Sequence, residues 1–316
     1  MNKLYSIGDQ VMPDVAMRVL KDEQDPLDWV GMSGIRLPMR FRDGKEVRSA
    51  PSTVQLYVNL CDPKAKGIHM SRLYMLLDEK AGKHPLAPVS VSNFLSQMLE
   101  SHSDFSTRAY VEFAFDQYLR RPALVSDHAG WNNYSVVVRG EHAQGTVHVD
   151  LQFVVHYSST CPASAALARQ SIQHQFDQDF GSVGTVSATR IRHWLGSDEG
   201  IVATPHGQRS SAGVVVRVDP NSETFPLTHL IDSVEIALAT PVQTAVKRVD
   251  EQEFALLNGQ NPMFCEDAGR RLKTCLDAES DVVDFQVRVE HYESLHAHNA
   301  VCMVAKGLPD GFKPVP

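Results

Sequence analysis

The chain has 316 residues, 43% of them hydrophobic, which is enough for one large domain or two of about 150 residues and excludes wholesale disorder. Its formal net charge of −8 argues against a nucleic-acid-binding protein, although it permits a local basic pocket for a small anion. No apolar run reaches the roughly 20 residues that cross a bilayer, and the first residues lack a signal-peptide core. We therefore expect a cytoplasmic protein without membrane or nucleic-acid partners, whose five cysteines are thiols.

The first half predicts an arm followed by strands and a helix. Residues 1–50 are rich in Pro, Asp, Arg and Gly with little periodicity, which predicts an extended N-terminal arm. Beyond it, alternation of apolar residues indicates strands and helical spacing indicates a helix. The predicted strands are 53–60, 108–116, 131–139 and 146–157, and the predicted helix is 89–100.

The second half repeats this order of elements. Strands are predicted at 210–218, 282–291 and 300–306, and helices at 228–238 and 264–276. Two more helices, 165–176 and 187–195, form a predicted insertion over about 165–204. The repeated order predicts an α+β chain of two similar modules, 51–160 and 161–307, with a tail at 308–316.

Four clusters place a thiol, imidazole or carboxylate beside a turn-forming residue. They are SSTCPAS (158–164), TPHGQRS (204–210), KRVDEQEF with NPMFCED (247–254 and 261–267), and HYESLHAHNA (291–300). Each is weak alone, because a lone Cys or His is usually structural and no CxxC or HExxH spacing is present. Together, a thiolate, imidazoles and a carboxylate suit Zn²⁺, Fe²⁺ or Mn²⁺ with a position left open for water.

In this order, the clusters resemble the GTP cyclohydrolase I family of type IB. The resemblance rests on Cys161-Pro162-Ala163-Ser164, His206-Gly207-Gln208-Arg209-Ser210, Lys247-Arg248-Val249-Asp250-Glu251, Asn261–Asp267, Glu293-Ser294-Leu295-His296-Ala297-His298 and Gly67–Arg72, and spans about residues 10–307. It implies a tunnelling fold (T-fold) of two tandem ββααββ modules, with antiparallel sheets that carry helices on one face. It also implies homotetramers with active sites at subunit interfaces. The implied reaction converts GTP and water to 7,8-dihydroneopterin triphosphate and formate, the first step of folate biosynthesis.

The resemblance also implies a metal site. Its candidate ligands are Cys161, His206, Glu251 and His296, with Glu293 close by, and its ion is Zn, Mn or Fe. Which of the imidazoles and carboxylates bind directly stays open.

Substrate-binding roles are implied for other residues. Cys161, His206 and Glu266 are the implied catalytic residues, with His206 either a ligand or an acid near the guanine imidazole ring. Glu266 would accept hydrogen bonds from guanine N1–H and the 2-amino group, although a carboxylate here also suits a helix N-terminus. Arg209, with Arg72 or Lys247, would bind the triphosphate.

One departure keeps alternatives open. Ala163 stands where many relatives carry a second Cys, so a two-thiolate zinc site is not expected. The alternatives are another T-fold purine or pterin enzyme, such as a nitrile reductase of queuosine synthesis or a pyruvoyl-tetrahydropterin synthase, and a catalytically silent purine-binding assembly module. Only Ala163 supports the silent module.

Overall fold

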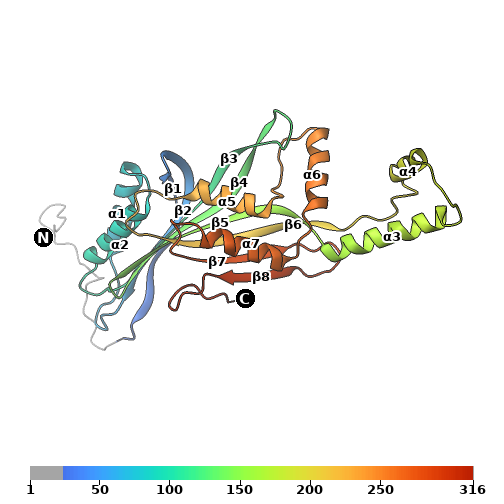
Figure 1. Cartoon of the computed structure of the whole chain (residues 1–316). Helices are drawn as coiled ribbons and strands as arrows, with labels where there is room; N and C mark the ends of the chain where they lie inside the picture. The colour runs from blue at the N-terminus through green and yellow to red at the C-terminus, as the bar shows by residue number, and fades with distance from the viewer. Residues whose placement is uncertain (1–23, 316) are drawn as a thin grey trace, which may run out of the picture. The chain divides into compact units, whose positions relative to one another are not determined.

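The computed structural model describes residues 24–315, and these fold into two compact units. Unit 1 comprises residues up to Gln117 with Ser135–Gln152 and Arg217–Thr228, and unit 2 comprises Tyr118–Tyr134, Phe153–Val216 and the residues from His229 onward. Residues 1–23 of the predicted arm lie outside the described residues. Its remainder forms the first strand and the start of the second (Figure 1).

The strands form one eight-stranded sheet whose spatial order equals the chain order. They are β1 (Leu27–Asp43), β2 (Glu46–Leu60), β3 (Ala109–Pro122), β4 (Ala129–Ala143), β5 (Thr146–Thr160), β6 (Gly207–Val218), β7 (Asp284–His291) and β8 (Ala300–Ala305). The pairs β1–β2, β2–β3 and β7–β8 are antiparallel. The helices are α1 (Met70–Lys83), α2 (Pro88–Ser101), α3 (Pro162–Phe180), α4 (Ala188–Leu195), α5 (Leu227–Leu238), α6 (Arg248–Gln260) and α7 (Cys265–Asp277).

The predicted tunnelling fold of two tandem ββααββ modules, with antiparallel sheets that carry helices on one face, is wrong for this chain. All eight described strands belong to a single sheet. Between β6 and β7 the chain also has three helices where two were predicted, the additional one being α6. Alternation along a strand reports which of its faces is buried, but it does not report which strands share hydrogen bonds.

Most individual elements were predicted correctly, and three were missed. The predicted strands fall within β2 to β8 with ends shifted by a few residues, and the predicted helices correspond to α2, α3, α4, α5 and α7. β1 was not predicted because its first half is exposed or half-buried on both faces and shows no clean alternation. Helix α1 was not predicted because its fully buried residues are only Leu73 and Leu77, which give a weak helical pattern. Helix α6 was not predicted because its residues were interpreted only as a charged cluster.

In unit 1, helix α2 packs its apolar face inward. Phe94, Leu95 and Met98 are buried, as their helical spacing predicted. At Gly140 of β4, an added Cβ would lie 2.5 Å from Val91 Cγ1 of α2. Only glycine therefore permits this close approach of helix and strand.

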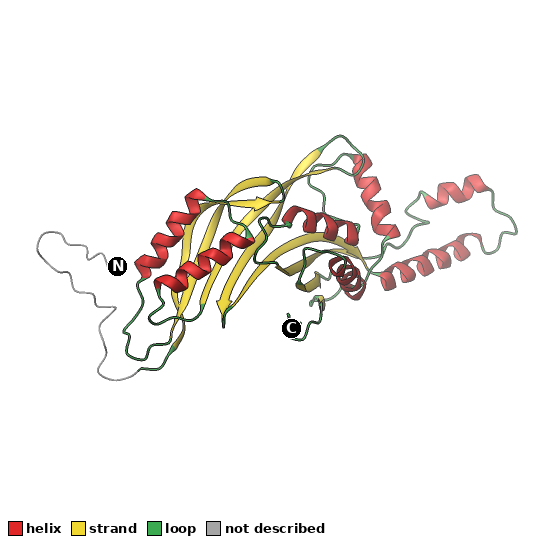
Figure 2. Cartoon of the chain, turned by 60° about the vertical axis from the view of Figure 1, so that its left-hand side comes forward, coloured by secondary structure: helices red, strands yellow, loops and turns green. Residues whose placement is uncertain are grey.

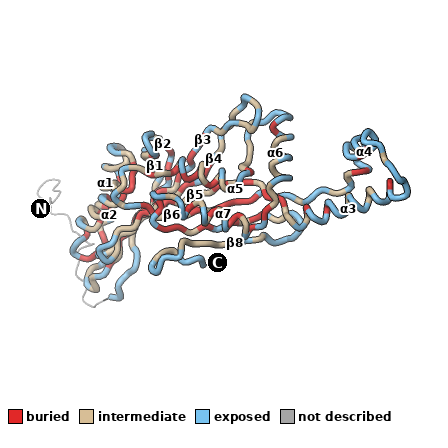
Figure 3. Tube along the Cα trace, viewed as in Figure 1, coloured by how far each residue is buried: buried red, intermediate tan, exposed pale blue. Residues whose placement is uncertain are grey.

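Unit 2 is built around the inner faces of α5 and α7 and the strands of the same unit. Figure 3 shows these helices as largely buried, and their fully buried side chains include Ile231, Val234, Leu272 and Leu276. None of the described helices is both long and apolar enough to cross a membrane.

The two helices predicted within 165–204 correspond to α3 and α4, which lie side by side away from the sheet strands of unit 2 (Figure 2). Trp194 of α4 packs edge-on against Phe176 and Phe180 of α3, with ring centroids 5.4 and 5.9 Å apart. Trp194 Nε1 also donates a hydrogen bond to Asp179 Oδ2 at 2.8 Å, which lowers the pKa of Asp179. The pair therefore has its own small core.

Truncation of the α7 face tests this packing. Leu272→Ala should lower the free energy of unfolding by about 2–5 kcal/mol, because it removes a fully buried side chain and leaves a cavity. Leu256→Ala on α6, where the side chain is 50% exposed, should change it by less than about 1 kcal/mol. Urea unfolding followed by circular dichroism measures both, and equal losses would contradict the assignment of α7 to the core.

Candidate functional site

A pocket of about 410 Å³ in unit 2 collects chemistry-bearing residues from four places in the chain. Cys161 and Ser164 come from the start of α3, His206 and Gln208 from the start of β6, Glu266 from the start of α7, and Glu293 and His296 from the β7–β8 loop. Leu167, Phe264 and Leu295 add apolar surface. The pocket thus combines apolar walls with a few convergent polar groups, as small-molecule sites do.

Cys161 and His206 are joined although the α3–α4 insertion separates them in the sequence. The backbone N–H of Cys161 donates to the carbonyl of His206 at 3.2 Å, and the N–H of His206 donates to Ser164 Oγ at 3.0 Å. Cys161 is the N-cap residue of α3, and its sulfur accepts a hydrogen bond from Ser164 N–H at 3.4 Å. The sulfur therefore lies at the positive end of the helix dipole, which favours negative charge.

Glu266 lies in the first turn of α7. The N-terminus of this helix is capped by Asp267, whose carboxylate accepts a hydrogen bond from the N–H of the N-cap residue Phe264 at 3.0 Å. The thiol of Cys265 donates to Glu266 Oε2 at 3.3 Å. Burial, together with this hydrogen bond, raises the pKa of Cys265 to about 12. The Cys265 thiol therefore stays neutral, and its hydrogen bond restrains one carboxylate oxygen of Glu266.

The opposite rim of the pocket is an exposed loop. Glu293 is half-buried and His296 is exposed, and the His296 ring stacks on His298 with centroids 5.0 Å apart. This part of the lining therefore comes from a loop whose side chains are mostly exposed.

The donor chemistry of the pocket suits a borderline-soft divalent cation. Two thiols, three imidazoles and two carboxylates line it, and this mixture matches Zn²⁺, Fe²⁺ or Mn²⁺. Within residues 24–315, however, no three His, Cys, Asp or Glu side chains are gathered closely enough to hold a metal ion. The residues fit such an ion by chemistry, but they are not assembled around one.

Comparison with known proteins identifies the family. The family model for type I GTP cyclohydrolase folE2 matches residues 12–302. The chain belongs to this family. It is 48% identical over 305 residues to GTP cyclohydrolase FolE2 of Hydrogenovibrio crunogenus, covering 96% of this chain and 97% of that protein. It is 50% identical over 290 residues to GTP cyclohydrolase FolE2 of Pseudomonas putida, covering 92% and 94%.

Similarity to the following solved structure is much weaker. The uricase of Arthrobacter globiformis superposes with a TM-score of 0.48 at 9% identity, covering 92% of this chain and 96% of that chain. A likeness at this level supports no argument about substrate or mechanism.

Four residues that the cyclohydrolase resemblance implied are not among those lining the pocket. Glu251 is exposed on α6, and Lys247 Nζ pairs with exposed Asp127 at 3.0 Å. Arg209 is exposed and, by strand alternation, points to the face of β6 opposite Gln208. Arg72 belongs to unit 1, where its Nη1 donates to the carbonyl of Ser101 at 2.8 Å.

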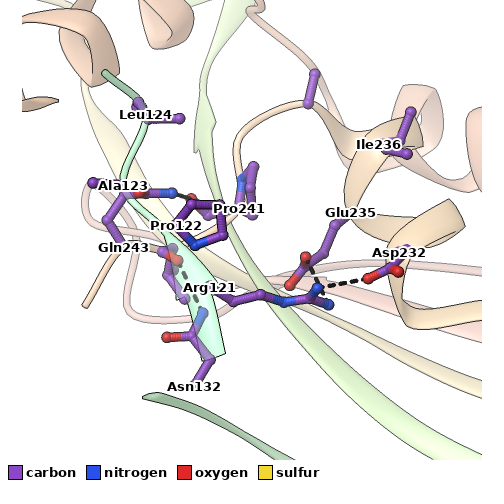
Figure 4. Close-up of a pocket in the computed structure, with 12 residues that line it drawn as sticks. Arg121, Pro122, Ala123, Leu124, Asn132, Asp232, Glu235, Ile236, Pro241 and Gln243 are labelled. Atoms are coloured by element: carbon purple, nitrogen blue, oxygen red, sulfur yellow. Dashed lines mark hydrogen bonds and ion pairs between the residues drawn. The ribbon is translucent and has the colours of Figure 1, made fainter. Parts of the chain in front are cut away.

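A second pocket in unit 2, of about 540 Å³, does not fit the chemistry of a cyclohydrolase (Figure 4). Its cation, Arg121, is already paired with Asp232 at 2.6 Å and with Glu235 at 3.1 Å. Its described lining contains no thiol or imidazole. Burial raises the pKa of Glu235, and the arginine therefore serves to stabilise a partly buried carboxylate.

Five buried polar residues in and next to the pocket lining were not predicted from the sequence. Tyr157, Ser159, Gln208, Ser210 and His291 are all buried and hydrogen-bonded to one another. A signal was present at Gln208 and Ser210, which are alternate polar residues on one face of a strand that continues as an apolar core face. Such a pattern indicates a buried polar network and not a solvated face.

Thiol labelling tests the exposure of the pocket. With iodoacetamide at about pH 8, Cys161 and exposed Cys61 should be alkylated at least about tenfold faster than Cys265, Cys275 and Cys302, because burial raises the pKa of those three thiols and the thiolate is the reactive form. Peptide mass spectrometry over time measures each rate. Labelling of Cys265 as fast as Cys61 would contradict the buried position described for it.

Proposed function

We propose that this chain is a cytoplasmic GTP cyclohydrolase I of type IB, which hydrolyses GTP to 7,8-dihydroneopterin triphosphate and formate at the Cys161–His206 pocket. This hydrolysis of GTP is the first step of folate biosynthesis. The observation that carries the proposal is the convergence of Cys161, His206, Glu266 and Glu293 on one pocket in a chain of the folE2 family.

Cys161, His206 and His296 are the proposed ligands of a divalent Zn, Mn or Fe ion, with Glu293 or Glu251 completing the set. When bound, such an ion would supply Lewis acidity and a nucleophilic water. Only Glu251 among these residues does not line the pocket, so its participation requires movement of α6 or a second subunit.

Glu266 is the proposed guanine anchor. Its carboxylate can accept hydrogen bonds from N1–H and the 2-amino group, while the Cys265 thiol restrains one of its oxygens. His206 is the proposed proton donor or acceptor near N7 of the guanine ring. Phe264 and Leu295 offer apolar surface for the flat purine.

The triphosphate requires cations that the described pocket lining does not contain, since it includes no Lys or Arg. We propose a homotetramer in which subunit interfaces bring Arg209, Arg72 or Lys247 to the phosphates. Lys247 is available for such a role because its ion pair with Asp127 is exposed and therefore weak.

The alternative that is not an enzyme is a catalytically silent purine-binding module. Its support is Ala163, which stands where many relatives carry a second Cys. The retention of the thiol, imidazoles and carboxylates around one pocket favours the enzyme, since a silent module needs only the guanine anchor.

A turnover assay tests the proposal. Protein reconstituted with Zn²⁺, Mn²⁺ or Fe²⁺ should release formate from GTP and yield a product that oxidises to fluorescent neopterin, and a chelator should remove the activity. Cys161→Ala should reduce kcat by more than the roughly 10–100-fold that loss of an outer-shell partner costs. Cys61→Ala, at an exposed thiol of unit 1, is the matched control and should keep full activity. No formate with any of the three metals would reject the enzyme.

Substitution of the guanine anchor should affect GTP specifically. Glu266→Ala should lower kcat/KM for GTP by about 100-fold or more, because two hydrogen bonds to a charged acceptor are lost. Glu253→Ala, a carboxylate on α6 that does not line the pocket, should stay within about twofold. Steady-state kinetics with GTP measures both, and equal effects would remove Glu266 from the substrate site.

A further inference from the structure

Helix α1 of unit 1 carries apolar side chains on its solvent side as well as on its buried side. Leu73 and Leu77 are at most 1% exposed, whereas Met70, Tyr74 and Met75 are 38%, 49% and 63% exposed. Single exposed apolar residues are normal on a protein surface, but three within six residues of one helix form a contiguous patch. Patches of this kind mark protein–protein contacts.

One face of α1 lines a groove of about 840 Å³ beside Ser101, the last residue of α2. This face, the α1 stripe, is spaced at three or four residues and comprises Arg72, Met75, Leu76, Glu79 and Lys83. Asp78 also lines the groove. Arg72 Nη1 donates to the carbonyl of Ser101 at 2.8 Å, which holds the guanidinium at the groove. The stripe therefore has an apolar middle, with a cation one turn before it and an anion one turn after it.

The charge order of the α1 stripe is complementary to itself. When two copies of α1 pack antiparallel about a two-fold axis that passes between Met75 and Leu76, each residue faces the one equally far beyond the axis. Arg72 then faces Glu79 of the partner subunit, and Met75 faces Leu76 of the partner subunit. The symmetry repeats both contacts, and the antiparallel direction opposes the two helix dipoles favourably. A second copy of this chain is therefore the occupant that the stripe fits.

Both charges of the stripe are able to bind a partner. Glu79 Oε1 pairs with Lys83 Nζ of the same helix at 3.1 Å, and these two side chains are 58% and 63% exposed. Such an exposed pair contributes little to stability and can exchange its partner. A guanidinium has five N–H donors, so Arg72 can bind a carboxylate while its Nη1 stays on the Ser101 carbonyl.

We propose that the α1 stripe is a two-fold interface at which a second copy of this chain docks antiparallel, with Arg72 on Glu79 and Met75 on Leu76. Such an interface deepens the proposed function and rests on it, since it forms one contact of the proposed homotetramer. It also engages Arg72 between subunits, which leaves Arg209 or Lys247 to bind the triphosphate.

Charge reversal in the full-length protein tests the pairing. Arg72→Glu and Glu79→Arg each place like charges opposite one another at both symmetric contacts, and each should raise the dissociation constant of this interface by about 100-fold or more. Size-exclusion chromatography with light scattering should then show a lower mass than in the wild type. Lys45→Glu, at an exposed turn of unit 1, changes the charge as Arg72→Glu does and should leave the mass unchanged.

An equimolar mixture of the two reversed variants is the decisive measurement. Position 72 of one variant then faces position 79 of the other with opposite charges at both contacts, so the wild-type mass should return. General destabilisation of either variant cannot produce this recovery. An unchanged mass in both variants, or a lower mass that does not recover on mixing, would overturn the antiparallel pairing.

A substitute is needed if Arg72→Glu does not fold after losing its contact with Ser101. Glu79→Arg and Met75→Asp change exposed side chains, so the fold should persist, as circular dichroism can verify. Each should lower the mass, because one repels Arg72 of the partner subunit and the other places a charge against the apolar middle. An unchanged mass in both would overturn the proposal.

The wild type separates the failure of this interface from the failure of the proposed function. A monomeric wild type would reject the interface together with the homotetramer. An oligomer that releases formate from GTP but keeps its mass in both reversed variants would reject the interface alone. An oligomer whose mass falls and recovers as expected, but which releases no formate, would reject the cyclohydrolase function and leave the interface standing.

Discussion

One backbone and one side-chain hydrogen bond between the start of α3 and the residue before β6 hold the candidate site together. They run from Cys161 N–H to the His206 carbonyl and from His206 N–H to Ser164 Oγ. Without them, the α3–α4 insertion would separate the thiol from the imidazole. The insertion is tolerated because loop closure costs only slightly more as a loop lengthens, and because α3 and α4 have their own aromatic contacts.

The pocket has a rigid floor and an adaptable rim. The floor is a polar network whose members are all buried and mutually satisfied, and breaking any member would leave an unpaired group in a low-dielectric environment. The rim, by contrast, is the exposed β7–β8 loop with Glu293 and His296. The possible metal ligands therefore share one pocket although no three of them in the described residues are close enough to bind an ion. Those beside β5 and β6 are held by the buried network, whereas those of the exposed loop are not.

The positions of most strands and helices followed from periodicity, since burial of one face imposes period two on a strand and about 3.6 on a helix. Where one face was not consistently buried, as in β1, the pattern gave no signal. The ordered motifs similarly led to Cys161, His206, Glu266 and Glu293, which line one pocket. The motifs did not show that Arg209 lies on the face of β6 opposite to Gln208.

The sequence by itself determined the family, through several motifs in a fixed order, and with it the reaction class and the types of donor group. It also determined which residues of each element are apolar. Only the tertiary structure decided that eight strands form one sheet, that Glu251 and Lys247 lie away from the pocket lining, and that Gln208 contacts both His206 and the buried Ser159. The physical reason is that strand pairing and side-chain hydrogen bonds join residues far apart in the chain. Tyr157, Gln208 and His291 are each unremarkable in their local sequence, and their roles arise only where β5, β6 and β7 meet.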